Sequence, residues 1–367
     1  MQEKRVAIVC DWIKDMWWAE LVLSHLMELF PQAHIYTSVF WQKNNELFTN
    51  KILKTSFIQK IPIINRYHKL ALFLRPFAFE SFDFSQYDIV ISSSSAESKW
   101  IITKPWTVHF CYCHTPTRYF WSHYYEYLSM MEFWFLNFLW KYCMPKTVHK
   151  LRQWDFVASK RVDYFIANSQ NIKNRIWKYY KMDACIIHPG IDTSKFYLSE
   201  KKDFYLAVWR IIPYKKFDLI VETFNKNEKP LIIITSTVNK LQKKLQALSK
   251  ENIVWKINIS HELRNKYYSE AKGFLFPQEE DFWIVPIEAM ASGTPVIAYH
   301  KGWATETVID EITWIFFENQ SVRSFYNAIE RFEKIEFHPE IIRNHALNFD
   351  TKFFQQKLLD FITSKIQ

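Results

Sequence analysis

Residues 274–306 read FLFPQEEDFWIVPIEAMASGTPVIAYHKGWATE, and this stretch decides the fold class. An apolar run at 273–277 is typical of a buried strand, and the apolar spacing from about residue 285 predicts a helix. A second apolar run, at 295–299, predicts another strand. Strands joined by a helical crossover pair in parallel, so the stretch indicates an α/β protein.

The same alternation of apolar runs and helix-period segments continues in both directions and is interrupted at His188-Pro189-Gly190, which predicts a hinge. We therefore predict an α/β fold of two doubly wound, Rossmann-like domains that face each other across a cleft. Ligands of such sheets bind at the carboxyl ends of the strands. The predicted limits are 1–188 for the first domain, 189–199 for the hinge, 200–347 for the second domain and 348–367 for a C-terminal helix that packs back on the first domain.

The composition is that of a folded protein with a basic surface. Hydrophobic residues make up 49% of the 367 residues and charged residues 23%, which allows real cores. The formal net charge of +9 favours anionic partners such as nucleotides, phospholipid head groups or acidic glycans. The basic residues are scattered, so the sequence does not support a nucleic-acid partner.

The cysteines and the apolar segments of the sequence indicate the cellular compartment. Five widely spread cysteines argue against a disulfide framework and favour a reducing environment. The first residues read as a strand and lack the apolar core and cleavage site of a signal peptide. The longest apolar stretch, 130–144, is too short and too polar to span a bilayer. We expect a cytoplasmic protein, or one held peripherally at the inner face of the plasma membrane.

Two glutamates in the opening stretch are separated by seven residues: Glu280 in the loop after the strand and Glu288 in the first turns of the helix. Together with the flanking FP, EAMASGTPVIA and ATE, this spacing resembles the E-x7-E signature of the retaining family 4 glycosyltransferases, which have the GT-B fold. The resemblance implies that Glu280 contacts the donor sugar and that Glu288 holds the nucleotide ribose. A carboxylate suits ribose because it accepts hydrogen bonds from both vicinal hydroxyls.

A pair of cations follows a predicted strand in the sequence YLAVWRIIPYK, residues 205–215. Arg210 and Lys215 resemble the R-x4-K pair of the same family. The resemblance implies that these two cations neutralise the donor diphosphate as it leaves, in place of a divalent metal. We therefore expect neither a metal nor a cofactor, with the nucleotide-sugar as a substrate.

The first domain carries two segments that resemble the amino-terminal half of this family, AIVCDWIKDMWWAE at 7–20 and YCHTPTRYFW at 112–121. Asp11 ends a predicted strand and is expected to face the cleft. His114 ends another strand, and the resemblance places it near the transferred sugar. Arg118 is a candidate for contact with the acceptor or with phosphate. A zinc reading of Cys111-Tyr-Cys113-His114 is disfavoured because no second pair of ligands follows.

Tryptophan stands repeatedly where the family has glycine. Trp17 and Trp18 occupy the glycine pair of G-G-A-E, the loop that closes on the donor diphosphate. In the second domain the expected donor contacts are Trp283, Gly302, Trp303 and Thr305. The two tryptophans among them stand at positions where the family has glycine. Trp100, Trp106 and Trp314 also replace glycine, and Trp209 and Trp255 are weaker cases. The whole chain has four glycines, where average usage of about 7% would give roughly 26.

An indole at positions 17 or 18 would fill space that a diphosphate needs, whereas glycine lets the backbone approach a phosphate closely. Repeated replacement by one residue type is not what chance substitution produces. We hypothesise that these codons are UGA in an organism that reads UGA as glycine. Residues 231–237, LIIITST, do not fit this hypothesis, because they lack the family's glycines and contain no tryptophan.

The resemblance implies a retaining, metal-independent transfer of a hexose to a glycan or lipid-linked acceptor. It extends to mannosyltransferases of surface-polysaccharide synthesis, so GDP-mannose is slightly favoured over a UDP-hexose as donor. Two alternatives stay open. If the tryptophans are native, the chain is expected to be an inactive sugar-nucleotide-binding or scaffold protein. The other is an epimerase or phosphorylase of the same fold.

Two further segments carry structural expectations. Residues 65–79, NRYHKLALFLRPFAF, mix basic and apolar residues, which fits either a membrane-surface segment or an amphipathic core helix. Residues 120–160 are long and aromatic and are predicted to be helical, with a break at Pro145.

Overall fold

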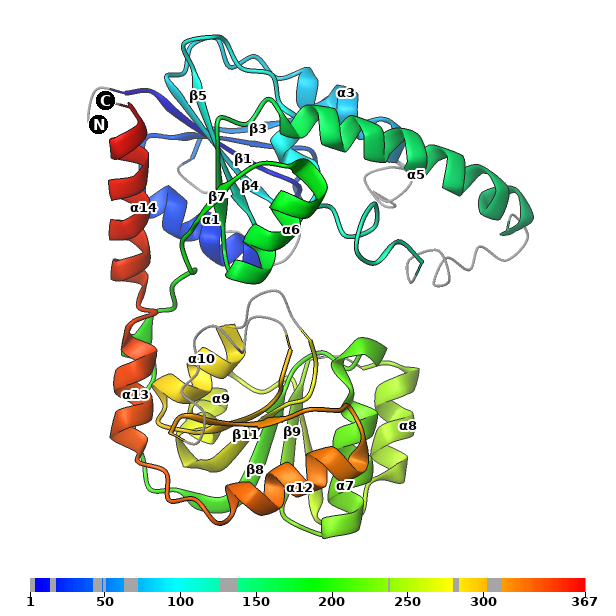
Figure 1. Cartoon of the computed structure of the whole chain (residues 1–367), viewed down its shortest axis with the longest axis vertical. Helices are drawn as coiled ribbons and strands as arrows, with labels where there is room; N and C mark the ends of the chain where they lie inside the picture. The colour runs from blue at the N-terminus through cyan, green and yellow to red at the C-terminus, as the bar shows by residue number, and fades with distance from the viewer. Residues whose placement is uncertain are drawn as a thin grey trace. The chain divides into compact units, whose positions relative to one another are not determined.

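A computed structural model of the chain (Figure 1) describes residues 4–13, 18–41, 48, 51–62, 72–125, 137–236, 238–279, 284–301 and 312–366. The chain divides into two compact units. Unit 1 comprises Met1–Pro189 with Phe354–Gln367, and unit 2 comprises Gly190–Phe353. Each unit is built on its own parallel sheet.

Unit 1 contains a seven-stranded sheet of order β3-β2-β1-β4-β5-β6-β7, in which every neighbouring pair is parallel. The interior strand β1, with the sequence VAIVC, is buried along its whole length, as an apolar run covered on both faces should be. The strands are β1 (Val6–Cys10), β2 (His34–Thr37), β3 (Leu53–Thr55), β4 (Ile89–Ser94), β5 (Val108–Cys113), β6 (Tyr164–Ala167) and β7 (Ala184–Ile186).

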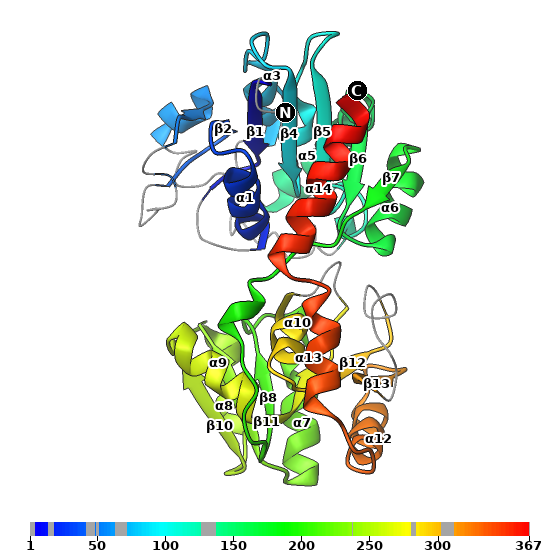
Figure 2. The same cartoon turned by 90° about the vertical axis from the view of Figure 1, so that its left-hand side faces the viewer.

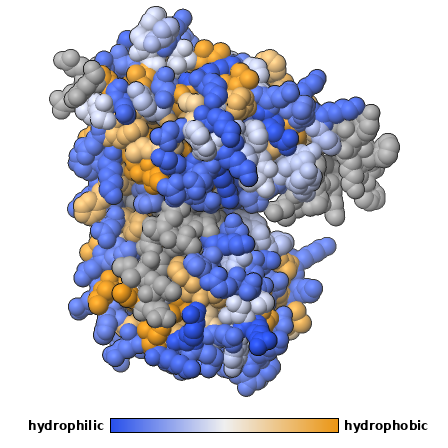
Figure 3. Space-filling view, in the orientation of Figure 1, coloured by the Kyte–Doolittle hydropathy of each residue, from blue (hydrophilic) through white to orange (hydrophobic). Residues whose placement is uncertain are grey.

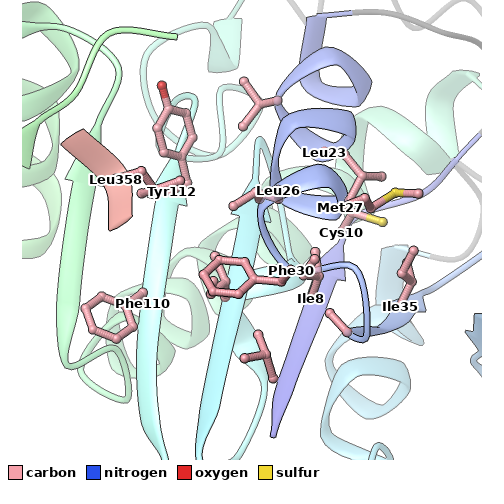
Figure 4. Close-up of a cluster of buried hydrophobic side chains, with 14 of the residues drawn as sticks. Ile8, Cys10, Leu23, Leu26, Met27, Phe30, Ile35, Phe110, Tyr112 and Leu358 are labelled. Atoms are coloured by element: carbon pink, nitrogen blue, oxygen red, sulfur yellow. The ribbon is translucent and has the colours of Figure 1, made fainter. Parts of the chain in front are cut away.

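Helices cover both faces of this sheet, and successive residues of β1 point into different cores because side chains alternate along a strand. Ile8 and Cys10 belong to the core shown in Figure 4, beneath α1 and the C-terminal helix α14. Ala7 and Val9 belong to the opposite core, beneath α3 and α5. Figure 2 shows α1 and α14 side by side on one face. The helices are α1 (Trp18–Leu29), α3 (Arg75–Glu80), α5 (Asn137–Ser159), α6 (Gln170–Tyr180) and α14 (Thr351–Ile366).

Unit 2 contains a six-stranded parallel sheet of order β10-β9-β8-β11-β12-β13. The strands are β8 (Lys202–Val208), β9 (Leu231–Thr235), β10 (Ile253–Ile257), β11 (Ala271–Phe276), β12 (Val296–Tyr299) and β13 (Trp314–Phe317). The helices are α7 (Phe217–Asn227), α8 (Lys240–Leu248), α9 (His261–Glu270), α10 (Ile284–Ala291), α12 (Val322–Phe332) and α13 (Pro339–Leu347). These two sheets confirm the predicted doubly wound fold class.

Each sheet has a point at which the strand order reverses. In unit 1 the reversal lies between β1 and β4, and in unit 2 it lies between β8 and β11. The loops that leave two such strands diverge to opposite faces of the sheet, which opens a crevice at the carboxyl edge. The sequence segments that resemble the family's donor and sugar contacts follow β1 and β5 in unit 1, and β8, β11 and β12 in unit 2.

Helix α5 corrects one expectation from the sequence. It begins at Asn137, ends at Ser159 and contains Pro145 in its interior, so the predicted break at this proline is wrong. A proline in a helix removes one hydrogen bond and costs about 3 kcal/mol. The buried side chains of Met144, Val148 and Leu151, which pack into the core under α5, offset that cost.

The segment 65–79 lies partly outside the described residues. In its described part, Phe79 is fully buried, whereas Phe73 and Phe77 are exposed. The apolar residues of this segment therefore both join the core and reach the surface.

On the face of the molecule in Figure 3 hydrophilic side chains predominate. No helix in the described part of the chain combines the length and the apolar character needed to cross a membrane.

Two of the tryptophans at family glycine positions form part of the cores. Trp100 is fully buried, stacks on Phe120 with a ring-centroid distance of 6.1 Å, and donates its indole N–H to Asp155 at 2.7 Å. Trp314 is also fully buried, with its N–H 2.8 Å from the sulfur of Met290. Trp106, by contrast, is 66% exposed.

We predict that Trp100→Gly lowers the free energy of unfolding by about 3–5 kcal/mol, because it empties a closed space in the core and removes a donor from Asp155. Trp106→Gly is the matched control, and its effect should stay below about 1 kcal/mol because the side chain is exposed. Urea denaturation followed by circular dichroism measures both. Equal or greater stability of the Trp100→Gly variant would contradict this packing and would support the recoding hypothesis.

Candidate functional site

The loop after β8 carries the two cations that the sequence singled out. Arg210 lies directly beyond the strand and is exposed. Lys215 ends the short 3-10 helix Pro213–Lys215 and is 1% exposed. The structure therefore places both residues at the switch point of unit 2, but it presents only Arg210 to solvent.

The ammonium of Lys215 is enclosed by aromatic rings. Its Nζ lies 3.7 Å from the ring centroid of Trp209 and 5.1 Å from that of Tyr214. A cation over an indole face is attracted by the ring quadrupole. Trp209, which the sequence marked as a weaker case of tryptophan for glycine, thus covers one of the two groups expected to meet the donor diphosphate.

Glu288 lies on α10, which follows β11, and is 7% exposed. The Tyr268 hydroxyl donates to one of its carboxylate oxygens at 3.0 Å, and the Arg264 guanidinium lies 3.7 Å from the other. Burial raises the pKa of this carboxyl above its usual value, against the opposing effects of Arg264 and Tyr268. A buried carboxylate held in this way has a fixed orientation, as a ribose-binding group requires.

Several predicted contacts lie outside the described residues: Trp17, Glu280, Trp283, Gly302, Trp303 and Thr305. Trp18 is the first residue of α1. The structure therefore describes Arg210, Lys215 and Glu288 of the donor site predicted in unit 2.

Unit 1 has a cavity of about 180 Å³ at its own switch point. One side comes from the end of β1 and the start of α1, and the other from the end of β4. The lining residues are Cys10, Asp11, Trp12, Glu20, Leu23, Ser93 and Ser95. Such a cavity at a switch point is a common position for a ligand site in α/β proteins.

Asp11 lines this cavity, but its carboxylate is engaged by the backbone. It accepts N–H bonds from Ser95 at 2.7 Å, Ala96 at 2.9 Å and Ser98 at 2.6 Å, all in the loop after β4. These three charge-assisted bonds fix the loop against the end of β1. The structure therefore gives Asp11 a role in shaping the cavity; direct contact with a substrate stays a prediction.

His114 follows β5 and is held beside the same cavity. Its Nε2 lies 2.8 Å from the hydroxyl oxygen of Ser93, which lines the cavity, and its backbone N–H donates to Ser94. Burial lowers the pKa of the imidazole to about 4, so the ring is neutral at physiological pH. A neutral imidazole can orient a hydroxyl group but cannot act as a cationic acid. Arg118, four residues further on, is half-buried.

A buried ion pair involves the segment that follows the loop after β4, and no pattern in the sequence indicates it. Lys99 and Asp155 are both fully buried, with 2.8 Å between Nζ and the carboxylate. Asp155 also accepts bonds from Trp121 and Tyr180, each at 2.7 Å. Burial alone would lower the pKa of Lys99, but the Asp155 carboxylate holds it above its ordinary value.

The cysteine segment beside His114 is part of the core. Cys111 and Cys113 are buried on β5 and pack against α6. Among the described residues, no group of three or more His, Cys, Asp or Glu side chains is arranged to hold a metal ion.

Comparison with known families gives this arrangement its context. Residues 19–195 match the family model described as Glycosyltransferase Family 4, and residues 190–349 match the model described as Glycosyl transferases group 1. The two matches adjoin and follow the two units. The chain belongs to the GT-B glycosyltransferases.

Individual relatives of this family are distant. The chain is 27% identical over 209 residues to the O-antigen chain mannosyltransferase RfbU of Salmonella typhimurium, covering 53% of this chain and 58% of that protein. It is 27% identical over 210 residues to an uncharacterised glycosyltransferase of Methanocaldococcus jannaschii, covering 54% and 58%. The aligned part thus spans less than two thirds of each relative.

The likeness in fold extends over the whole chain. The crystal structure of Anabaena HepE in complex with UDP and glucose superposes with a TM-score of 0.70, covering 99% of this chain and 100% of that one at 13% identity. At this identity the likeness shows the GT-B fold alone.

We predict that Trp209→Gly tightens the binding of UDP or GDP roughly two- to thirtyfold, because it releases Lys215 from a cation–π contact of about 0.5–2 kcal/mol. Calorimetric titration measures the dissociation constants. Trp255→Gly, a change of the same kind on β10, should leave them unchanged. Adding Lys215→Ala to Trp209→Gly should abolish the gain. Unchanged or weaker binding by Trp209→Gly would show that Lys215 does not meet the nucleotide.

Proposed function

We propose that the chain is a retaining, metal-independent glycosyltransferase that moves a hexose from a nucleotide-diphosphate sugar to a glycan or lipid-linked acceptor. One observation carries the proposal. Arg210 and Lys215 lie in the segment that follows β8. The helix that carries the buried Glu288 follows β11, and β11 pairs in parallel with β8. The cations proposed to bind the diphosphate and the carboxylate proposed to bind the ribose therefore follow two neighbouring strands at one switch point.

The proposed chemistry follows from these groups. Arg210 and Lys215 would stabilise the leaving diphosphate electrostatically, which is the task that a divalent metal performs elsewhere. By the family resemblance, the leaving diphosphate itself helps to deprotonate the acceptor, so no side chain is needed as general base. The rate would then come from positioning and charge stabilisation.

The donor sugar and base are proposals of the same kind. RfbU is named as a mannosyltransferase, which supports mannose. We favour GDP-mannose as the donor, with a UDP-hexose as the alternative. For location, we propose the cytoplasm, with contact to a membrane surface that the exposed Phe73 and Phe77 would provide.

Calorimetric titration of UDP, GDP and their hexose conjugates, in the presence of EDTA, tests this function. Two forms of the protein are compared: the sequence as it stands, and a form with glycine at positions 17, 18, 100, 106, 283, 303 and 314. Binding by the glycine form alone would support recoding and identify the nucleotide. Binding that requires a metal would contradict the proposal, and so would absence of binding by both forms.

A second candidate is an inactive sugar-nucleotide-binding protein. The enclosure of Lys215 by Trp209 favours it, because a covered ammonium cannot neutralise a diphosphate. Donor binding without turnover, in a form whose Trp209 is retained, would support this candidate.

We predict that Glu288→Gln weakens nucleotide binding roughly ten- to hundredfold, because ribose loses a charge-assisted acceptor. Its free energy of unfolding at pH 7 should be unchanged or higher. The raised pKa in the folded state means that the ionised carboxylate is a cost at neutral pH, and this cost disappears as the pH falls through that pKa. The stability difference between the variant and the parent should therefore shrink toward pH 4.

Glu270→Gln serves as the control for Glu288→Gln. Glu270 lies in the same unit and forms an ion pair with Lys202 at 2.9 Å. This pair lies at the amino ends of β8 and β11, away from the switch-point crevice at their carboxyl ends. If the Glu288→Gln variant binds the nucleotide as tightly as the parent does, Glu288 does not hold the ribose.

A further inference from the structure

Unit 2 has a cavity of about 190 Å³ at the amino ends of its strands. Among the residues that line it, Lys201 directly precedes β8, Lys272 is the second residue of β11, and Pro295 directly precedes β12. The switch-point crevice lies at the carboxyl ends of β8 and β11, so the cavity and the proposed donor site lie at opposite edges of one sheet.

The described lining of this cavity has one positive charge in excess. Its ionisable residues are Lys201, Lys272 and Glu333. Lys272 and Glu333 form an ion pair at 2.8 Å, and Asp203 and Lys229 extend this pair into a cluster without net charge. Lys201 is partly buried, and within the described part of the chain it has no carboxylate partner. Burial lowers the pKa of its ammonium to about 7, so a nearby anion would stabilise the charged form.

The Lys201 ammonium donates to three neutral oxygens. They are the backbone carbonyl oxygens of Ser269 at 2.8 Å and Ser292 at 3.1 Å, and the hydroxyl oxygen of Thr294 at 2.6 Å. Ser269 lies in the last turn of α9 and Ser292 directly follows α10, where the helix dipole favours a cation. A carboxylate oxygen is a stronger acceptor for an ammonium than a carbonyl oxygen. A bound carboxylate can therefore replace Ser292, the most distant of the three acceptors.

The apolar part of the lining limits the rest of the ligand. It includes Phe332, Ile335, Phe337 and Pro339, and the rings of the two phenylalanines stack with a centroid distance of 4.8 Å. The volume is sufficient for one six-membered ring, since a cavity of about 150 Å³ holds benzene. One ammonium in excess and one apolar wall fit a small organic monoanion that carries a ring or a branched alkyl group.

The same ammonium is linked to Glu288 through the two helices that it contacts. The Thr294 hydroxyl, which accepts from Lys201, donates to the backbone carbonyl of Tyr268, and the Tyr268 hydroxyl donates to Glu288. Ser292, the other end of the link, lies four residues after Glu288 in the chain. A ligand that draws Lys201 away from Ser292 therefore removes a support from the helix that carries Glu288.

We propose that this cavity is an effector site for a small organic monoanion with an apolar group, such as an aromatic carboxylate, that the Lys201 ammonium binds this anion, and that the bound anion weakens nucleotide binding. The site itself rests on the cavity and its charge. The effect on the nucleotide rests on the proposed function, in which Glu288 holds the ribose.

Benzoate and benzamide test the site in the absence of nucleotide, because they have nearly the same shape and only benzoate is charged. Saturation-transfer NMR at about pH 6, below the pKa of Lys201, gives both dissociation constants. The parent should bind benzoate roughly tenfold more tightly than benzamide, Lys201→Met should remove this preference, and Lys201→Arg should retain it. Equal binding of the two probes by the parent, or unchanged benzoate binding by Lys201→Met, would overturn the proposal.

Two further variants make this test specific. Lys202→Met is the matched control, because Lys202 is an exposed neighbouring lysine that pairs with Glu270; it should bind benzoate as the parent does. Phe337→Ala leaves Lys201 in place, so it tests the cavity even if Lys201→Met does not fold. It should raise the dissociation constant of benzoate roughly two- to tenfold and leave that of acetate, which has no ring, unchanged. Parent-like benzoate binding by Phe337→Ala would refute the apolar wall.

Calorimetric titration of UDP and GDP, with and without saturating benzoate, tests the effector role. Benzoate should raise the dissociation constant of the nucleotide roughly fivefold, and the nucleotide should weaken benzoate binding by the same factor, because coupling between two sites is reciprocal. Unchanged nucleotide affinity would refute the effector role. Benzoate binding without any nucleotide binding would refute the proposed function, and with it the effect on the nucleotide, but would leave the anion site standing. Nucleotide binding without benzoate binding would refute the site and leave the function standing.

Discussion

The carboxylate of Asp11 is the constraint on which the rest of unit 1 depends. It stands at the end of the interior strand β1 and gathers three backbone amides of the loop after β4, so two neighbouring strands end in one rigid structure. These three hydrogen bonds to Asp11 set the geometry of the switch point of unit 1. Asp11 and Ser95 both line the cavity, and Glu97 belongs to the same loop as Ser95. Truncating Asp11 to alanine would leave the three N–H groups without this acceptor.

Behind that loop, the polar groups of the core form a second layer of support. Asp155 binds Lys99 and Trp100, which are adjacent in the chain, and also Trp121 and Tyr180, which come from two other segments. Breaking a buried pair of this kind is strongly destabilising, because the surviving charge stays in a medium of low dielectric constant. Lys99 and Trp100 directly follow Ser98 in the chain, so this network and the Asp11 carboxylate hold the same loop at adjacent positions.

The fold could be predicted from the sequence because its signals are local. The run VAIVC predicts a buried parallel strand on its own, and 274–306 contains a complete strand–helix–strand unit. The break expected at Pro145 was wrong because the tertiary packing of α5 outweighs the local cost of a proline inside a helix. Lys99 and Asp155 were missed for a related reason. Trp100 and Asp155 are 55 positions apart, and no periodicity marks two residues whose only link is contact in the folded chain. Lys215 was found by its motif, but its enclosure by Trp209 is a matter of side-chain packing.

Helix α14 has a consequence for how the protein is made. Phe354, Leu358 and Ile362 belong to the same core as Ile8 and Leu26, so unit 1 is built from two segments of the chain that are separated by the whole of unit 2. Unit 2 is contiguous from Gly190 to Phe353. During synthesis the second unit can therefore complete its core while the first still exposes the apolar surface that α14 will cover. The usual order, in which the domain that is synthesised first also folds first, is therefore reversed. Until α14 has been synthesised, unit 1 is the part of the nascent chain that most needs a chaperone.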